Sequence, residues 1–187
     1  GTAKAELGAN STTAAEYDIQ ILADSTNRGY ATGHGVTVGG LVVGGMVTRV
    51  DIGAGNSIDE AVATLGAGAQ IVDARFVTIQ ANSYNEAYAE GQSAGGGLIS
   101  ITGSLATVDS DQATRLDIGS GALISAESVS LQSNNLQLMD VKSEALSFGV
   151  ATGAGALARN SASGDARINI GNNAEISAVN ISVLAKN

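Results

Sequence analysis

Aliphatic residues alternate with polar residues along several short stretches of the chain, and each stretch follows a glycine. In one of them, Val129 and Leu131 alternate with serine and glutamine. A period of two with β-branched residues predicts a strand that has one buried face. The same phrase, a large aliphatic residue, a glycine, a short turn and then such a strand, occurs four times. The four copies are residues 5–23, 63–81, 116–133 and 168–185.

The four copies recur at a nearly constant spacing. Spacings of 58, 53 and 52 separate the anchor glycines, which are Gly8, Gly66, Gly119 and Gly171. Spacings of 58, 52 and 52 separate matching positions in the following strand, which are Ile19, Val77, Val129 and Ile181. The agreement of two separate anchors indicates a tandem repeat of about 52 residues.

We therefore expect one continuous repeat array over residues 1–187. Its units cover about 4–61, 62–114 and 115–166, with a partial fourth unit over 167–187. The extra residues of the first unit fall near Gly53, Asn56 and Asp59, in a polar stretch that predicts a surface loop. The chain has neither an initiating Met nor a signal peptide, and we interpret it as an internal segment of a longer protein.

A turn with a left-handed residue is predicted once in every unit. The position two residues after each anchor glycine holds only Gly or Asn, namely Asn10, Gly68, Gly121 and Asn173. Gly and Asn adopt positive φ most easily, so this position reflects a backbone requirement.

These elements predict an all-β fold, and we expect a β-solenoid resembling a parallel β-helix. A unit of about 52 residues with several short strands suggests two or three coils, and a rod of roughly 40–50 Å at ~4.8 Å per coil. A helix of one or two turns is expected over residues 58–65. An inward ladder, its members separated by intervening coils, would contain Leu7, Leu65, Ile118 and Ile170. The alternative is a row of small antiparallel β-domains, but units this small with 3% aromatic residues would bury too little surface.

The charge and composition of the chain argue against several classes of binding partner. The net charge is −9 and 9 basic residues are spread along the chain, which argues against nucleic acid and anionic membranes. No apolar run approaches the ~18 residues needed to span a membrane. Cysteine is absent, so no disulfide framework is expected.

The residues that could perform catalysis are few. His34 is the single histidine and is interpreted as a surface turn residue. Two acidic pairs, Asp109 with Asp111 and Asp59 with Glu60, are interpreted as solvated loop residues because glycan-cleaving sites usually add sugar-stacking aromatics. The loop expected around Tyr84 and Tyr88 is the candidate for a glycan contact. We predict no enzyme, no catalytic residue and no cofactor.

Three further features concern a possible metal ion, the turns and the charge of the surface, and the basic register among them is expected to serve solubility and to prevent lateral aggregation. A structural calcium ion is left open at Asp51, Asp109 or Asp111, although neither calcium-binding repeat motif occurs. The Gly39-Gly40 and Gly95-Gly96-Gly97 clusters lack the Lys-Ser/Thr of a phosphate loop and predict tight turns or close backbone packing. One outward register is basic in three units out of four, with the residues Lys4, Val62, Arg115 and Arg167.

The repeated phrase resembles the repeat regions of giant bacterial exoproteins of the filamentous-haemagglutinin-like or adhesin type. The matching stretches are IGSGALISAESVSLQS (118–133), IGNNAEISAVNISVLA (170–185) and the one-residue-longer LGAGAQIVDARFVTIQA (65–81). The resemblance implies export, an extracellular or cell-surface location, and a spacer or binding role.

These observations give one functional hypothesis and two alternatives. We expect a non-catalytic structural segment of a large secreted or cell-surface bacterial protein, an adhesin stalk or a biofilm matrix element. The alternatives are a self-assembling extracellular filament subunit and a carbohydrate-binding or polysaccharide-acting β-helix. The expected partners are neighbouring repeats of the parent chain, other copies of the chain, and surface glycans.

Overall fold

The computed structural model describes residues 2–53 and 59–187, and within them the chain is all-β with no helix. The strands are β1 (Thr2–Leu7), β2 (Thr12–Ala14), β3 (Asp18–Val38), β4 (Leu41–Ile52), β5 (Asp59–Leu65), β6 (Gln70–Ile118), β7 (Leu123–Ile170) and β8 (Glu175–Lys186). The helix predicted over 58–65 is wrong, because residues 59–65 form β5 between two parallel partners, β1 and β6. Ladder pairing on both sides outweighs a weak local helical preference.

Each repeat unit lies directly on the preceding unit. Ile19 of β3 pairs in parallel with Val77 of β6, and Val77 pairs in turn with Val129 of β7, so the backbone joins the same position of consecutive units. The strand pairings of the described residues are all parallel, and none joins strands within a single unit. The expectation of two or three coils per unit is therefore wrong: one unit makes one circuit, which we call a layer. The pairing also argues against separate antiparallel domains.

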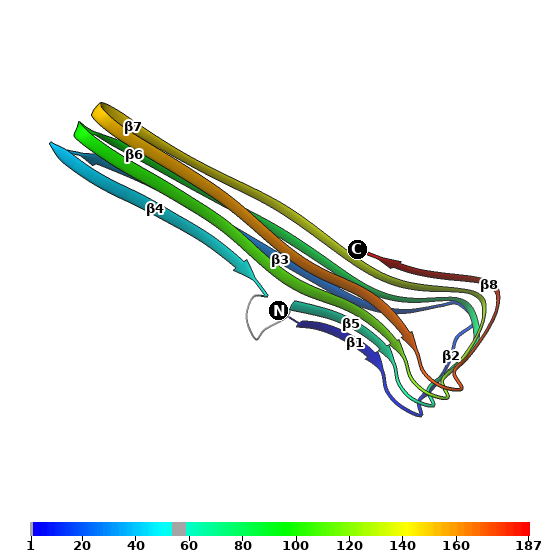
Figure 1. Cartoon of the computed structure of the whole chain (residues 1–187). Coiled ribbons are helices and arrows are strands. Elements are labelled where there is room, and N and C mark those ends of the chain that lie inside the picture. Colours follow the sequence, from blue (N-terminus) through cyan, green and yellow to red (C-terminus); the bar gives the residue numbers. More distant parts are fainter. Residues whose placement is uncertain (1, 54–58) are drawn as a thin grey trace.

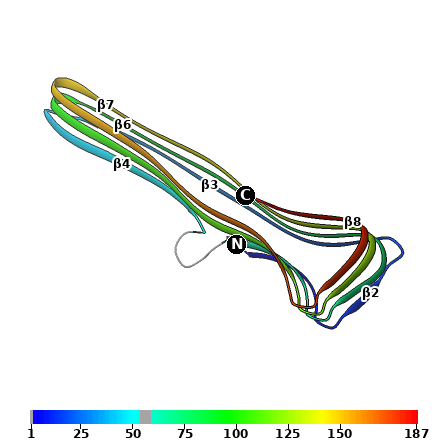
Figure 2. The same ribbon diagram turned by 45° about the vertical axis from the view of Figure 1, so that its right-hand side comes forward.

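A layer is a long, flattened loop (Figure 1). We call residues 18–38, 76–96 and 128–148 the outgoing arm, and residues 41–52 with 59–65, 99–118 and 151–170 the return arm. The arms meet at a narrow end, the tip (36–47, 94–105 and 146–157), and separate at a three-sided end, the base (Figure 2). At ~3.3 Å per residue the 21 residues of β3 span about 70 Å, whereas the four stacked strands β1, β5, β6 and β7 span about 14 Å. The molecule is thus long across its layers rather than along the stack, in contrast to the predicted rod.

Aliphatic side chains fill the interior of the base. Leu65, Ile71, Ile79 and Leu116 are fully buried there, together with Ala81. The predicted ladder is present, because the backbone pairing links four residues in direct succession, Leu7, Leu65, Ile118 and Ile170. Leu65 and Ile118 are buried, whereas Ile170 is 50% exposed. No coil lies between them, which differs from the expected arrangement.

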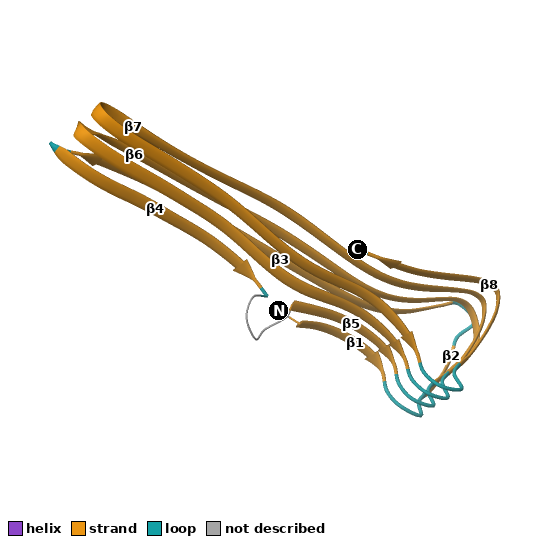
Figure 3. Cartoon of the chain, in the orientation of Figure 1, coloured by secondary structure: helices purple, strands orange, loops and turns teal. Residues whose placement is uncertain are grey.

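The turns at the base confirm the predicted left-handed position. The φ values are 55° at Asn10, 65° at Gly68, 68° at Gly121 and 56° at Asn173. Figure 3 shows these turns side by side in successive layers. The anchor glycine serves a second purpose, since a Cβ atom on Gly119 would overlap the backbone nitrogen of Ala67 in the layer beneath. The base therefore requires glycine for close stacking as well as for the turn.

Changes in pairing register locate the extra residues. Ile52 pairs with Ser110 and Asp59 pairs with Gln112, so the chain from Ile52 to Asp59 is longer than the chain between their two partners. This confirms the insertion near Gly53, Asn56 and Asp59, although residues 54–58, on which the loop prediction falls, lie outside the described residues. A second shift between Ile71 and Ala74 marks a β-bulge, in which Asp73 has a φ of 57°.

Candidate functional site

The single histidine lies on a strand. His34 is an exposed residue of β3, and its Nδ1 atom is 3.1 Å from Oε1 of Gln92 in the next layer. The prediction of a surface position is confirmed, but the predicted turn is wrong because the arm continues through this glycine-rich stretch.

One member of each acidic pair, Asp109 and Glu60, takes part in an ion pair that links neighbouring layers. The predicted loop position is wrong, because Asp109 and Asp111 lie in β6 and Asp59 and Glu60 lie in β5. Asp51 and Asp109 stack in register, and Arg49 contacts both, with Nε 2.7 Å from Asp51 Oδ1 and Nη2 3.3 Å from Asp109 Oδ2. The hydrogen bond to Asp51 raises the pKa of Arg49 above its ordinary value. Arg115 likewise contacts Glu60 at 3.5 Å and Asp117 at 2.7 Å. Each of these carboxylates faces outward next to a guanidinium, and the side chain of Asp59 is not among those described.

The calcium candidates do not gather into a ligand set within residues 2–53 and 59–187. Asp51 and Asp109 are partly neutralised by Arg49, and no group of three or more His, Cys, Asp or Glu side chains in this part of the chain could hold a metal ion together. Calcium prefers six to eight oxygen ligands, which this outward row does not assemble.

The tyrosines predicted to lie in a loop belong to β6. Tyr84 and Tyr88 lie on the outer face of the outgoing arm, where the backbone pairs Tyr88 with Tyr30. The Tyr88 hydroxyl donates to Glu90, which raises the pKa of Tyr88, and Lys142 Nζ lies 5.3 Å from the ring centroid. A shallow cavity of about 280 Å³ borders Tyr30, Tyr88 and their neighbours. Tyr30 and Tyr88 therefore lie side by side among charged residues, and the glycan hypothesis stays a prediction.

The basic register is confirmed as a physical row. The backbone aligns Lys4, Val62, Arg115 and Arg167 across four strands. Each basic residue pairs with an acid on its own strand: Lys4 with Glu6 at 2.8 Å, Arg115 with Asp117 at 2.7 Å and Arg167 with Asp165 at 2.5 Å. The row therefore forms local ion pairs and not a free basic stripe.

The glycine clusters form the turn at the tip, as predicted. Gly39 donates its N–H to Gly96 O at 3.0 Å, and Ile99 donates to Gly40 O at 3.1 Å, so the ladder continues around the turn. A Cβ atom on Gly97 would overlap the carbonyl oxygen of Gly39. Close stacking of successive turns explains why glycine occupies these positions.

The sequence patterns did not predict that polarity reverses at the tip. Small polar side chains point inward there, among them the buried Ser100, Thr102 and Ser104. The outer face carries exposed aliphatic and aromatic residues, including Val36, Val38, Leu41, Val43, Val47, Ile99, Ile101, Leu146, Phe148 and Leu157. The three tip segments contain no Asp, Glu, Lys or Arg. The absence of charged residues was the one feature of the sequence that could have indicated the apolar outer face of the tip. Deciding which residues point inward and which point outward also requires knowing which residues oppose one another across the layer.

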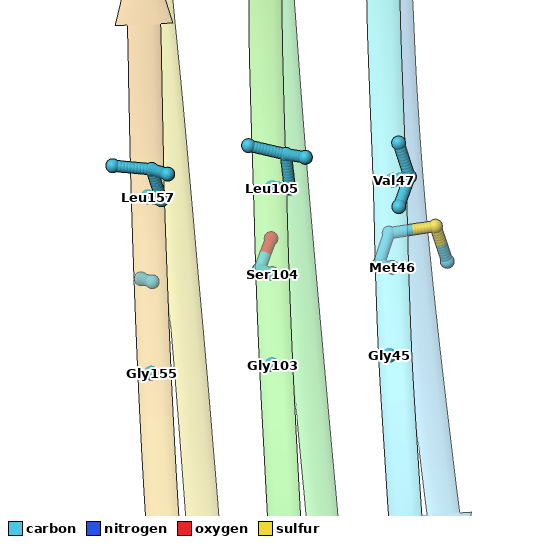
Figure 4. A pocket seen from close by; sticks show the side chains of 9 residues that line it. Gly45, Met46, Val47, Gly103, Ser104, Leu105, Gly155 and Leu157 are labelled. Atoms are coloured by element: carbon cyan, nitrogen blue, oxygen red, sulfur yellow. The ribbon is translucent and has the colours of Figure 1, made fainter.

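A groove crosses the outer face of the return arm at the tip. Its floor is the stacked row of Gly45, Gly103 and Gly155, which a row of Val47, Leu105 and Leu157 borders on one side (Figure 4). Val43 and Ile101 border the groove on the other side, two residues before the glycines. The cavity measures about 420 Å³ and is lined mainly by apolar atoms. We call residues 41–47, 99–105 and 151–157 the apolar strip.

Comparison with known proteins yields no relative: no family model, curated protein or solved structure matches the chain. The resemblance to haemagglutinin-like repeats therefore stays a prediction. Among the described residues, no helix has the length and hydrophobicity needed to cross a membrane.

Proposed function

We propose that this chain is a non-catalytic structural segment of a large secreted or cell-surface bacterial protein. As a β-solenoid, it would serve as part of an adhesin stalk or of an extracellular matrix. The observation that carries the proposal is the pairing of each unit with the next unit, position by position, at the spacing of the sequence repeat. Such pairing lets any number of units extend one axis with the same contacts.

The chemistry of the layers supports this role. The backbone of every layer is paired through most of its length, and outward charges form ion pairs within or between layers. Side-chain amides also bond along the stack, as Asn134 donates to Asn82 at 3.0 Å and Asn82 donates to Asp24 at 2.6 Å. These contacts join layers and leave few side chains free to converge on a substrate.

Longer arrays test the solenoid. Copies of residues 119–170 are inserted after Ile170, and the particle dimensions are measured by small-angle X-ray scattering. Each added unit should lengthen one axis by about 4.8 Å and raise the free energy of unfolding. An increase of tens of ångströms per unit, with unchanged stability, would instead indicate independent domains and would reject the solenoid.

The proposed extracellular location of the protein requires a separate test. Antibodies against this segment should label intact cells of the source bacterium or its culture medium. Labelling that requires permeabilised cells would overturn the extracellular assignment without affecting the stacked architecture.

Open strand edges favour filament formation as the alternative. β4 pairs with β6 on one side only, and β8 covers β7 only as far as Asn134. Unpaired edges accept further strands. Electron micrographs of concentrated protein should then show fibres whose width is set by the ~70 Å arms, and purely monomeric particles would dismiss this alternative.

A further inference from the structure

The two end faces of the base differ in shape. We call the base layer of the first unit, residues 4–25, the lower end face, and that of the fourth unit, residues 167–187, the upper end face. On the upper end face, inward side chains project from the stack, since Ile181 is 51% exposed and Val183 is 53% exposed. The residues beneath them in the same ladders, Val129 and Leu131, are at most 2% exposed. The upper end face therefore presents core side chains that a further layer would bury.

The lower end face is hollow where the upper end face projects. It borders a cavity of about 520 Å³, whose inward-facing lining residues are Ala5, Leu7, Thr13, Ile19 and Ile21. Ile21 is only 8% exposed, although it pairs with a layer on one side alone among the described residues. Ile19 and Ile21 occupy the same ladders as Ile181 and Val183. The two faces are therefore complementary in shape and in ladder position.

The backbone pairing within the chain also fits this contact. The N–H of Gly171 donates to Ile118 O in the layer beneath at 2.8 Å. Gly8 on the lower end face and Ile170 on the upper end face occupy the corresponding donor and acceptor positions. The hydrogen bonds that join layers within one copy can thus continue from one copy to the next.

The outward charges at the two faces favour the same direction. One ladder runs from Asp24 through two asparagines to Lys186, so a second copy stacked in the same direction places its Asp24 beside Lys186. Lys4 would lie over Arg167, but these residues already contact Glu6 at 2.8 Å and Asp165 at 2.5 Å on their own strands. Two upper faces or two lower faces would instead place projection against projection or hollow against hollow.

We propose that the upper end face of one copy seats in the lower end face of the next, so that copies of this chain associate head to tail through the base. This inference rests on the filament alternative and deepens it by naming the joining surfaces and their direction. Residues 167–187 add a layer at the base and not along the arms, so the arms of consecutive copies stay one layer apart. The arm edges and the apolar strip take no part in the contact.

The area of the end faces is sufficient for a stable complex. Residues 4–25 follow a perimeter of about 73 Å at ~3.3 Å per residue, and side chains extend about 5 Å to either side, half the spacing of packed sheets. Each face therefore covers about 700 Å², and the contact buries about 1,400 Å² in total. Stable interfaces bury about 1,200–2,000 Å².

Gly8 provides a variant that tests the contact without disturbing the fold. A Cβ atom on Gly8 meets no atom within 4 Å in a single copy. At the equivalent Gly171, however, a Cβ would lie 2.6 Å from Ser120 N in the layer beneath. Gly8→Ala should therefore fold normally and place its methyl group against the backbone of Asn172 in the copy beneath, which blocks the lower end face.

Gly39 provides the matched control in the same layer, at the tip. A Cβ atom on Gly39 meets only Val42 Cγ2 at 3.4 Å and Leu41 O at 3.8 Å, which are ordinary contacts. At the equivalent Gly97, a Cβ would overlap the carbonyl oxygen of Gly39 in the layer beneath. Gly39→Ala would thus block a contact between tips and leave a contact between bases intact.

A second variant blocks the opposite face. Ile181→Asp places a carboxylate where the contact would bury it in the apolar hollow of the next copy, whereas in a single copy the side chain is half exposed. Gly8→Ala keeps an intact upper end face and Ile181→Asp keeps an intact lower one. An equimolar mixture of the two variants therefore contains one complete contact and no second one.

Sedimentation over about 1 µM to 1 mM measures association, with melting temperatures as the check on folding. We expect oligomers of the unaltered chain that lengthen with concentration, by about 19 Å along the stack for each copy. Gly8→Ala and Ile181→Asp should each weaken association about tenfold or more, and Gly39→Ala should leave it unchanged. The mixture should form dimers and nothing larger.

Three results would overturn the proposal. A chain that stays monomeric at about 1 mM rejects both this contact and the filament alternative, while the stalk proposal keeps its own test by unit insertion. Association that Gly39→Ala weakens and Gly8→Ala does not would place the contact at the tips, which rejects this contact and retains the filament. A mixture that associates no better than either variant alone would exclude the head-to-tail direction.

Discussion

The two ends of each layer are packed in different ways. At the base, the chain encloses a three-sided interior in which aliphatic side chains such as Leu65 and Leu116 are fully buried. At the tip, the arms approach so closely that a Cβ atom on Gly95 would overlap Cγ2 of Thr102. Most inward positions at the tip hold Gly, Ala, Ser or Thr, with Val42 and Met46 as exceptions, and the other large aliphatic residues of the tip face outward.

The interior of the tip is joined by hydrogen bonds instead of apolar packing. Ser104 Oγ donates to Gly91 O at 2.7 Å, and Thr102 Oγ1 donates to Leu146 O at 2.9 Å, each bond reaching from the return arm to the outgoing arm. A carbonyl in the ladder keeps a second lone pair, so these bonds add to the pairing between layers. The comparison indicates that the base supplies most of the stability and that the tip is available for contacts with other molecules.

Truncating one leucine at each end should give the largest difference. Leu116→Ala removes a fully buried side chain from the base and should cost about 2–5 kcal/mol of unfolding free energy. Leu157→Ala, at a tip residue that is 60% exposed, should change it by less than about 0.5 kcal/mol. Urea denaturation of the two variants measures both values. Equal losses would mean that the tip is as strongly packed as the base.

Glycine substitutions sharpen the same comparison. Gly119→Ala at the base places its Cβ against the backbone of Ala67 and should cost about 1–3 kcal/mol, because backbone cannot move aside as a side chain can. Gly155→Ala at the tip meets no atom within 4 Å and should stabilise the strand by about 0.5 kcal/mol, since alanine has less freedom to lose. Thermal unfolding compares the two. A gain in stability for Gly119→Ala would show that the layers can separate at the base without cost.

Features fixed by the local backbone or by the repeat were predictable from the sequence. The left-handed turn at Gly68 and Gly121 was readable because few residues adopt positive φ. The Leu65–Ile118 ladder was readable because the repeat offset is also the pairing offset. The repeated phrase of the second unit is one residue longer than those of the two following units, and this extra residue forms the β-bulge at Asp73.

The number of circuits per unit and the chemistry of the tip were not predictable in the same way. Residues 91–104 contain glycine, serine and threonine at the inward positions, so alternation gives no contrast between a buried face and an exposed one. The sequence of this stretch predicts short strands separated by glycine, whereas in the structure the strands of both arms continue through the glycines. Which face is inward depends on the opposing arm, as the contact of Ser104 with Gly91 shows, and this pairing is not encoded by spacing alone.

Two serines test whether hydroxyl bonds hold the tip together. Ser104→Ala removes the bond to Gly91 O and should cost about 0.5–1.5 kcal/mol. Ser100 is equally buried, but its hydroxyl has no hydrogen-bond partner among the described residues, so Ser100→Ala should be neutral or slightly stabilising. Urea midpoints of the two variants provide the measurement. If both losses are equal, cross-arm bonding does not explain the polar interior.

The smallest expected effect concerns the response to pH, which should be confined to the arms outside the tip. The tip segments contain no Asp, Glu, Lys, Arg, His or Tyr, whereas Tyr88 donates to Glu90 and has a raised pKa. A raised pKa in the folded state means that this contact stabilises the fold below the unfolded pKa of about 10 and is lost as the pH rises through the folded value. Glu90→Gln removes the charge that holds the proton, so the Tyr88 midpoint should fall. The pKa of Tyr30, which Glu86 raises, should stay the same and is the internal control. Titration of ¹³C-labelled tyrosine by NMR resolves the two rings, and an unchanged Tyr88 midpoint would show that Glu90 does not retain this proton.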